Sequence, residues 1–313
     1  MSNEAAPAKS TRRLAADAIG EAAAILLAGG TVAFPTETVY GLGADATSGA
    51  AVAGIYAAKE RPRFNPLIAH APDIGAAMAH GVFNAHARHL AEAFWPGPLT
   101  LVVPLATSSP ICDLARAGLL SVGLRVPAHP VATALLRAVG RPVVAPSANR
   151  SGHVSPTTSA HVLSDLDGRI DAVIDGGPTR VGVESTIVAC LDDEPRLLRA
   201  GGVPREALEP ALGRRLSVAE GAIIAPGMLA SHYAPRASLR LDAERVAPGE
   251  AALLFGPTPP RGADLMHAIN LSPRGDLAEA AANLFAALRA LDALGAASIA
   301  VAPIPHEGLG EAI

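Results

Sequence analysis

The sequence predicts a two-domain α/β or α+β protein whose larger domain has a mixed sheet with flanking helices. Three observations predict this fold class. The length of 313 residues, at one to two hundred residues per domain, suggests two domains. Half of the residues are hydrophobic, which is ample for a packed core. Short apolar runs typical of strands alternate along the chain with segments of helical periodicity.

The predicted elements of the first domain follow one another closely. Residues 1–10 are expected to be a disordered tail, and residues 11–28 have the apolar spacing of a helix that ends at Gly29 and Gly30. Further helices are predicted over residues 47–59, 84–94, 130–139, 157–166 and 204–213. Thr47 or Ser48 is expected to cap one of them and Asn84 another. Strands are predicted over residues 31–35, 67–69, 99–105, 122–126, 142–146, 172–174, 186–191 and 196–199.

A polar, proline-containing stretch over residues 224–235 separates this part from a smaller α/β unit. Its composition is that of a linker, yet Met228, His232 and Tyr233 are unusual in a passive spacer. Beyond it, strands are predicted over residues 251–255 and 298–304, with a long amphipathic helix over 277–294 between them. The predicted organisation is therefore a tail (1–10), a first domain (11–205), a linker (206–237) and a second domain (238–313).

Charge and cysteine content exclude several classes of protein. The formal net charge of −4 argues against a duplex-binding surface, which normally carries a basic stripe. Two cysteines are too few for a disulfide framework or a zinc site. No stretch reaches the roughly 18 uncharged apolar residues of a spanning helix, and the charged start is a poor signal peptide. We therefore expect a cytoplasmic protein with no membrane partner and no stable nucleic-acid binding.

The first segment that could carry chemistry is Pro-Thr-Glu-Thr-Val-Tyr-Gly-Leu-Gly, residues 35–43. In an extended chain Thr36, Thr38 and Tyr40 would share one side, and the glycines after them permit close backbone approach to a polar ligand. On composition alone, an ordinary strand and turn with exposed threonines is the favoured explanation.

A second segment, residues 59–67, gathers cations where a helix ends. Lys59 is one of only two lysines among 25 basic residues, and Arg61 follows two positions later. A guanidinium grips phosphate through two hydrogen bonds, and an ammonium supplies a compact point charge. For this segment taken alone, the favoured explanation is a solvated helix C-terminus whose cations complement the helix dipole.

Other polar residues stand at the ends of predicted strands. Ser147 and Asn149 are two apart and could both offer donors to phosphate, although serine and asparagine are common in turns. Ser185 could meet a ligand or satisfy loop backbone. Arg125 lies in an apolar strand, where a cation is costly unless an anion pairs with it. His70 ends a strand, where a structural histidine is the commoner explanation.

The order of these segments is more informative than any one of them. Pro-Thr-Glu-Thr-Val-Tyr-Gly-Leu-Gly is followed by Lys-x-Arg-Pro with Asn-Pro-Leu, Trp-Pro-Gly-Pro-Leu-Thr, Arg-Val-Pro, Pro-Ser-Ala-Asn and Glu-Ser-Thr-Ile. This order closely resembles the YrdC-like family over about residues 11–202. Pro-Gly-Met and His-Tyr-Ala-Pro further on, with a second domain, are similar to its two-domain form, the threonylcarbamoyl-AMP synthases. The resemblance implies a twisted mixed sheet with flanking helices, a linker crossing the active site, and a smaller Rossmann-like C-terminal domain.

The resemblance also implies a reaction and its residues. In the family, L-threonine, bicarbonate and ATP give threonylcarbamoyl-adenylate, pyrophosphate and water, with Mg²⁺ carried by ATP rather than by protein side chains, and a downstream tRNA threonylcarbamoyltransferase machinery uses the product. The implied threonine-binding residues are Thr38, His70, Arg125, Ala145 (through its backbone) and Ser185. The implied ATP-binding residues are Arg61, Asn65, Ser121, Ser147, Ser155, Arg199 and Tyr233. The implied catalytic tetrad is Lys59, Arg61, Ser147 and Asn149.

Two other functions fit parts of the pattern. A non-catalytic RNA-binding module of the same fold would need a basic concave face, which the net charge does not support. A carbamoyl-transfer domain of hydrogenase maturation normally sits beside zinc-binding cysteines that this sequence lacks. Between Pro-Gly-Met and His-Tyr-Ala-Pro the family often carries basic residues, whereas this chain has Leu-Ala-Ser.

Overall fold

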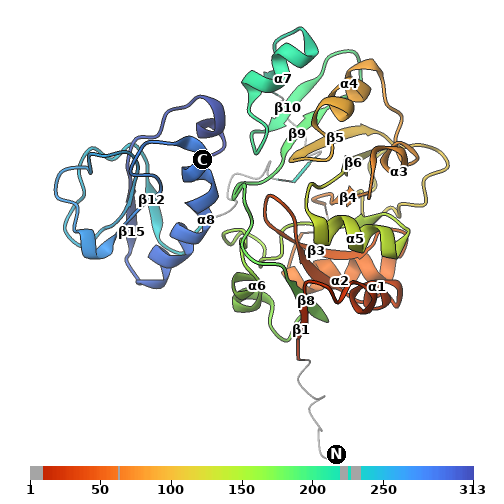
Figure 1. Cartoon of the computed structure of the whole chain (residues 1–313), viewed down its shortest axis with the longest axis horizontal. Helices are drawn as coiled ribbons and strands as arrows, with labels where there is room; N and C mark the ends of the chain where they lie inside the picture. Colours follow the sequence, from red (N-terminus) through yellow and green to blue (C-terminus); the bar gives the residue numbers. More distant parts are fainter. Residues whose placement is uncertain (1–9, 63, 219–224, 227–233) are drawn as a thin grey trace, which may run out of the picture.

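The computed structural model describes residues 10–62, 64–218, 225–226 and 234–313, and within these ranges the chain forms two separate sheets (Figure 1). The larger sheet contains, in spatial order, β1 (Arg12–Ala15), β8 (Ala172–Asp175), β2 (Val32–Pro35), β3 (Tyr40–Asp45), β7 (Val143–Val144), β4 (Ile68–His70), β6 (Ser121–Arg125), β5 (Leu99–Pro104), β9 (Thr186–Ala189), β10 (Arg196–Arg199) and β11 (Ser217–Val218). Parallel pairs such as β4 with β6 alternate with antiparallel pairs such as β5 with β6, so the sheet is mixed.

The smaller sheet is parallel and carries one long helix. Its strands, in spatial order, are β12 (Ser238–Arg240), β15 (Ser298–Val301), β13 (Ala251–Leu254) and β14 (Ala268–Asn270). The long helix α8 (Leu277–Ala293) lies on the side that faces the larger unit, and 3-10 turns span Leu265–His267 and Gly308–Glu311 (Figure 1). The predicted fold class, a mixed α/β sheet with a second, smaller α/β unit, is confirmed.

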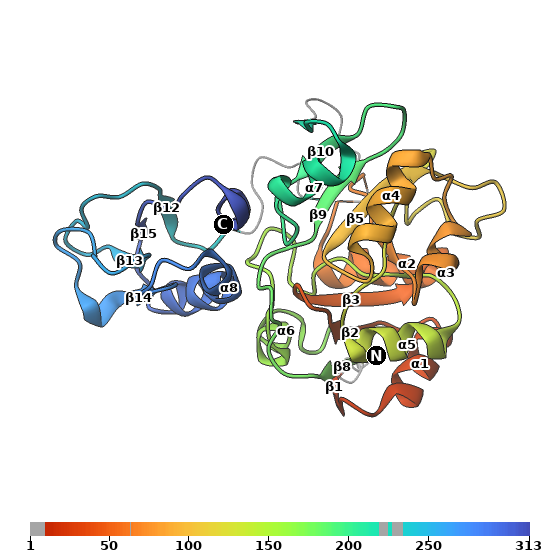
Figure 2. The same ribbon diagram turned by 45° about the horizontal axis from the view of Figure 1, so that its top comes forward.

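Helices cover the two faces of the larger sheet unequally. They are α1 (Ile19–Leu27), α2 (Gly49–Lys59), α3 (Ile74–Met78), α4 (Ala85–Phe94), α5 (Pro130–Val139), α6 (Ser159–Leu166) and α7 (Arg205–Leu212). Along β2, Val32 and Phe34 pack with α1 and α5, whereas Ala33 packs in the core that the other helices share. Figure 2 shows α1 and α5 side by side on one side of β3, with α4 on the other.

Beyond α1 and α5, that first face of the sheet is covered differently. Over β4, β5 and β9 the buried side chains of Ile68, Val102 and Ile187 pack with Ala225, from the segment that joins the two units, rather than with a helix. No described helix covers this part of the sheet face.

The helix starts follow from local sequence. The Ser48 side chain accepts a hydrogen bond from the amide of Ala51 and caps α2, and Asn84 caps α4 by the same contact to Ala87, as predicted. Helix α5 ends at Gly140, whose φ of 65° is the left-handed conformation that glycine adopts readily.

Long-range pairing explains most differences from the prediction. Residues 11–28 do not form one helix, because Arg12–Ala15 pair in parallel with β8 and only residues from Ile19 on are helical. Residues 40–45, for which no strand was predicted, form β3 between β2 and β7. The helix predicted over residues 204–213 is present as α7, but residues 206–218, assigned to the linker, also include β11, which was not predicted and pairs with β10.

The two units share a hydrophobic cluster. Val39, Val154 and Val183 of the larger unit belong to the same buried cluster as α8 side chains, among them Leu284 and Phe285. None of the described helices is both long and apolar enough to cross a lipid bilayer.

Candidate active site

A narrow cavity lies on the part of the sheet that no helix covers in the described structure. It is lined by Thr36, Val39, Gly41, Arg61, Ile68, His70, Arg125, Ala145, Pro146, Ser147, Glu184, Ser185, Arg199 and Pro226. Seven predicted site residues are thus brought together: Arg61, His70, Arg125, Ala145, Ser147, Ser185 and Arg199. A larger hollow of about 550 Å³, bordered by Thr47, Pro72 and Arg141, contains none of the predicted residues.

Strand direction explains this convergence. Strands β4 and β6 are parallel with His70 opposite Arg125, so both side chains stand at the same edge and on the same face of the sheet. Strand β5 is antiparallel to β6 and parallel to β9, so β9 begins where β6 ends. Ser185, directly before β9, therefore reaches the same edge, where its hydroxyl contacts that of Thr100 at 2.8 Å.

Arg125 is paired inside the protein. Its Nη2 donates to Oε1 of Glu37 at 2.6 Å and to the hydroxyl of Thr38 at 2.9 Å, and the amide of Ala128 donates to the other Glu37 oxygen. Both charged side chains are 4% exposed. The anion that Arg125 was expected to need is thus Glu37, which the sequence analysis did not select. The Nε of Arg125 has no hydrogen-bond partner among the described residues.

Lys59 lies beneath the cavity rather than in its lining. Its Nζ donates to the carbonyl oxygens of Ser147 at 2.6 Å and of Asn149 at 2.5 Å, so the ammonium fastens the turn that presents Ser147. Burial and then the charge of Arg61 lower the pKa of Lys59 to about 7. The two carbonyl contacts favour the charged form. A compact ammonium fits this enclosed position, where a planar guanidinium would need more room.

Arg61 and Asn65 form a second buried group. The Nε of Arg61 donates to the carbonyl of Asn65 at 3.4 Å, and its Nη2 donates to the carbonyl of Pro66 at 3.2 Å. The side-chain oxygen of Asn65 is buried without a partner among the described residues. Arg61 lines the cavity, and Asn65 stands behind it.

His70 is an uncharged group. Its Nδ1 lies 3.2 Å from the carbonyl oxygen of Ile68 and donates to it in the tautomer that carries the ring proton on Nδ1. Burial and then the charge of Arg125 lower the pKa of His70 to about 3. The imidazole is therefore neutral at physiological pH and suits a hydroxyl or ammonium donor.

Arg199 and Glu184 border the other side of the cavity. Arg199 donates to the Ser185 hydroxyl at 3.0 Å and to its carbonyl at 2.8 Å, and lies 3.7 Å from Glu184. Glu184 also accepts from the hydroxyl of Ser155 at 2.7 Å. Ser155 thus acts behind the lining. Glu184, like Glu37, was missed, although both stand inside motifs that the sequence analysis quoted.

Some of the remaining predicted residues lie near the cavity and others do not. Thr36 and Thr38 do come together, with hydroxyls 2.8 Å apart, but Tyr40 turns away and donates to the carbonyl of Gly177. The expectation of three hydroxyls on one side is wrong for Tyr40, because residues 36–39 form a tight turn instead of an extended chain. Ser121 lines a neighbouring hollow. Tyr233 lies outside the described residues.

The side chains around the cavity carry a net positive charge, whereas the whole chain has a formal net charge of −4. Among the described residues, four basic side chains (Lys59, Arg61, Arg125, Arg199) and two carboxylates (Glu37, Glu184) lie in or directly behind the cavity lining. The described residues include no group of three or more His, Cys, Asp or Glu side chains placed to hold a metal ion. This geometry concentrates positive charge in a cavity at the edge of a mixed α/β sheet, an arrangement that suits small anionic molecules.

Comparison with known proteins gives the family. Residues 24–201 match the Sua5–YciO–YrdC family model, described as "Telomere recombination", and residues 203–313 match the model for the C-terminal domain of threonylcarbamoyl-AMP synthase. The chain belongs to the Sua5–YciO–YrdC family, in its two-domain form.

Named relatives agree with this assignment. The threonylcarbamoyl-AMP synthase of Bacillus subtilis is 48% identical over 229 residues, covering 71% of this chain and 66% of that protein. The Pyrococcus abyssi threonylcarbamoyl-AMP synthase is 40% identical over 310 residues, covering 93% and 90% of the two chains. The crystal structure of Pyrococcus abyssi Sua5 complexed with L-threonine superposes with a TM-score of 0.87 at 36% identity, covering 96% of this chain and 94% of that one.

Proposed function

We propose that this protein makes L-threonylcarbamoyl-adenylate from L-threonine, bicarbonate and ATP, with release of pyrophosphate and water. One observation carries the proposal: Arg125, His70 and Ser185 share a single cavity with Arg61 and Arg199. Relatives named threonylcarbamoyl-AMP synthase and a related structure complexed with L-threonine support it. We assign the product to the N6-threonylcarbamoyladenosine modification of tRNA by a downstream transferase machinery, and we assign the reaction to the cytoplasm.

Threonine is bound at the Arg125 side of the cavity. Its carboxylate meets Arg125, whose buried Nε has no partner among the described residues, and Thr38 borders the same guanidinium. Its ammonium or hydroxyl meets Nε2 of His70, the Ser185 hydroxyl and the backbone of Ala145. A site that hydrogen-bonds a substrate hydroxyl strongly rejects analogues without one, because its own polar groups are then left unpaired.

ATP is bound at the side of Arg61, Ser147 and Arg199. We assign Asn65, Ser121, Ser155 and Tyr233 to ATP as well. Asn65 and Ser155 serve there by holding Arg61 and Glu184 in place.

The chemistry needs proximity rather than a protein nucleophile. The carboxylate of N-carboxythreonine attacks the α-phosphorus of ATP, the new P–O bond replaces the bond to pyrophosphate, and the site must bring two anions together. Fixed cations and donors offset their repulsion. Arg61 and Ser147 act on the substrates directly, whereas Lys59 and Asn149 position the turn that carries Ser147.

Mg²⁺ enters this site with ATP. The described residues offer no carboxylate cluster for a protein-bound ion, and both cavity carboxylates already face arginines, so coordination by the triphosphate fits the donor set present. When bound there, Mg²⁺ neutralises phosphate charge.

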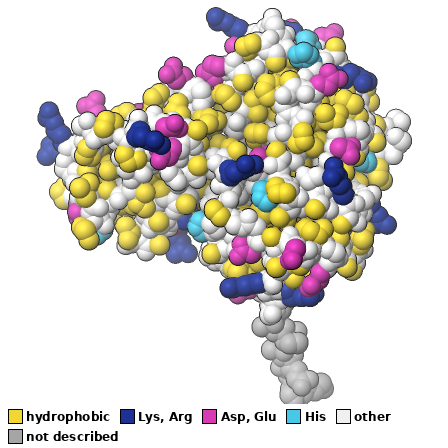
Figure 3. All heavy atoms as spheres, in the orientation of Figure 1, with side chains coloured by type: hydrophobic (Ala, Val, Ile, Leu, Met, Phe, Trp, Pro, Cys, Tyr) yellow, Lys and Arg dark blue, Asp and Glu magenta, His cyan; other side chains and the backbone are white. Residues whose placement is uncertain are grey.

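The test is threonine- and bicarbonate-dependent release of pyrophosphate from ATP. Arg61→Ala is expected to abolish it, whereas Arg169→Ala, an exposed arginine paired with Glu60, is expected to leave the rate unchanged. Pyrophosphate release that ignores threonine would overturn the proposal. Salt-dependent tRNA binding without adenylate formation would instead favour an RNA-binding module. On the face in Figure 3, basic and acidic side chains are scattered among apolar ones without a continuous basic stripe.

A further inference from the structure

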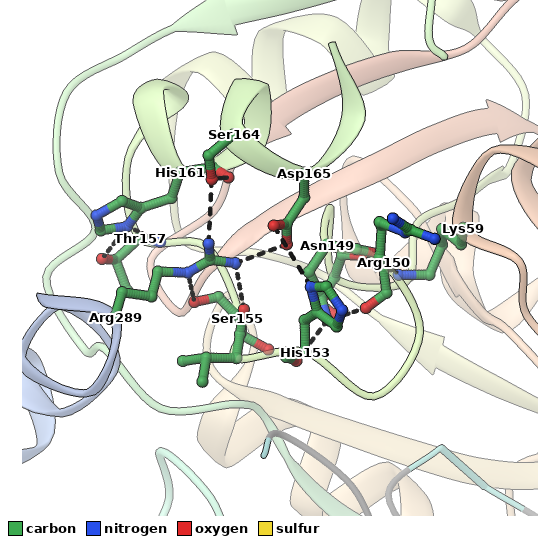
Figure 4. Close-up of polar contacts among 12 residues, drawn as sticks. Lys59, Asn149, Arg150, His153, Ser155, Thr157, His161, Ser164, Asp165 and Arg289 are labelled. Carbon is green, nitrogen blue, oxygen red and sulfur yellow. Dashed lines mark hydrogen bonds and ion pairs between the residues drawn. The ribbon is translucent and has the colours of Figure 1, made fainter. Parts of the chain in front are cut away.

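Arg289, on helix α8 of the smaller unit, reaches into the larger unit (Figure 4). Its side chain is 15% exposed and its Nη2 lies 2.9 Å from Oδ2 of Asp165 on α6. The same guanidinium donates to the carbonyl oxygens of Val154 and Ser155 and to the hydroxyl of Ser164. One residue of the second unit thus makes four contacts to residues 154–165 of the first.

One route leads from these contacts to the cavity through Ser155. Arg289 holds the carbonyl of this residue, and the Ser155 hydroxyl donates to Oε1 of Glu184 at 2.7 Å. Glu184 lines the cavity beside Arg199. A shift of residue 155 therefore moves the carboxylate that faces Arg199.

A second route leads through His153. Its Nδ1 lies 3.5 Å from the other Asp165 oxygen, and its carbonyl accepts from Nδ2 of Asn149 at 2.7 Å. The carbonyl of Asn149 accepts from Lys59. Figure 4 shows these side chains as one continuous group between Arg289 and Lys59.

Apolar contacts of α8 act at the same places. Three valines belong to the same buried cluster as this helix, and each is next in sequence to a residue of the site or its support: Val39 follows Thr38, Val154 precedes Ser155, and Val183 precedes Glu184. The buried cluster that contains α8 therefore includes a residue from each of three segments that border the cavity or its support.

We propose that Arg289 is a positioning residue for adenylate synthesis, which fixes residues 149–155 and so the placement of Glu184, Asn149 and the turn held by Lys59. The inference rests on the proposed function. Its physical basis is that two backbone carbonyls and the largely buried Asp165 would lose their charged donor if Arg289 were removed.

The experiment compares Arg289→Met with Arg205→Met in the full-length chain. Arg205 is a matched control, because it also joins the two units, through its pair with Glu311, and its other hydrogen bond goes to the carbonyl of Leu216 rather than to residues 149–155. We expect Arg289→Met to lower kcat/KM for ATP about tenfold or more, and to speed deuterium uptake by peptides covering residues 147–155. Arg205→Met is expected to stay within twofold in kcat/KM and to leave that exchange unchanged.

Two further variants separate positioning from loss of folding. Arg289→Lys keeps the charge without the planar fork and is expected to lose less activity than Arg289→Met while remaining folded. Asp165→Asn combined with Arg289→Met is expected to be no worse than Arg289→Met alone, because both act through one contact.

The outcomes are distinguishable. Arg289→Met within twofold of wild type, equal losses in both methionine variants, or lost activity with unchanged exchange at residues 147–155 would each overturn the inference. Wild-type protein without threonine-dependent pyrophosphate release would instead overturn the proposed function, and the exchange comparison would still report whether Arg289 orders residues 149–155.

Discussion

Glu37→Gln is expected to destabilise the larger unit strongly. Glu37 and Arg125 form an ion pair of 2.6 Å with both side chains 4% exposed. The substitution removes the charge that compensates Arg125 and turns one acceptor of the carboxylate into an amide donor, which then faces the amide of Ala128 or the guanidinium. Breaking a buried pair in this way costs about 3–5 kcal/mol.

The assay is urea unfolding followed by the fluorescence of Trp95. This residue is the only tryptophan in the chain, is buried, and donates to the carbonyl of Leu99 at the start of β5, so it reports on the larger unit. Glu37→Gln should lower the free energy of unfolding by the amount above. Adding Arg125→Met should restore part of the loss, because no buried charge is then left alone.

Glu60→Gln is the matched control. Glu60 makes the same kind of contact, to Arg150 and Arg169, but at the surface, where its side chain is 52% exposed. Solvent screens such pairs, so we expect little change in stability. A loss below about 1 kcal/mol for Glu37→Gln, or a loss no larger than that of Glu60→Gln, would refute the argument that burial makes this pair important.

Three further predictions concern protons and packing. The pKa of Lys59 is about 7 in the folded protein and 10.5 ordinarily, so between pH 7 and 10.5 the unfolded chain binds more protons and the free energy of unfolding rises with pH. In Lys59→Met this free energy should rise less steeply with pH than in the wild type. Equal slopes in the two proteins, measured by urea unfolding at several pH values, would contradict this. His70 should show no NMR titration between pH 5 and 8, and a midpoint near 6.5 would rule out the buried neutral ring. Gly182→Ala should lower the melting temperature more than Gly177→Ala. Both glycines have positive φ, but only at Gly182 would the added methyl group clash, with the carbonyl oxygen of Ala281. Equal decreases in melting temperature would show that backbone strain alone matters.

Local features of the fold could be predicted from sequence. The caps at Ser48 and Asn84 and the stop at Gly140 depend on a few neighbouring residues, and the structure confirms them. Strand β1 could not be found in this way, since its partner β8 lies about 160 residues further along the chain. The helical spacing of residues 11–28 correctly predicted the helix from Ile19 on, but it wrongly predicted helix for residues 12–15, which form a strand.

The site residues likewise differ in whether the sequence alone could identify them. Sequence order placed Arg61, Arg125 and Ser185 among the candidates, and they do share a cavity. Glu37 was missed because its importance comes from a cation 88 positions away. The place of Lys59 could not be foreseen either, since its acceptors are backbone carbonyls, which no residue pattern reveals.

The valines that face α8 have a consequence for how the chain can be recombined. Val39, Val154 and Val183 share one core with Leu284 and Phe285, so the boundary between the two family regions does not separate two self-contained modules. A chimera that joins the first region to a relative's second region would unite mismatched halves of that core. Substitutions on one side of it must therefore be matched by changes on the other, and the two regions are constrained to diverge together.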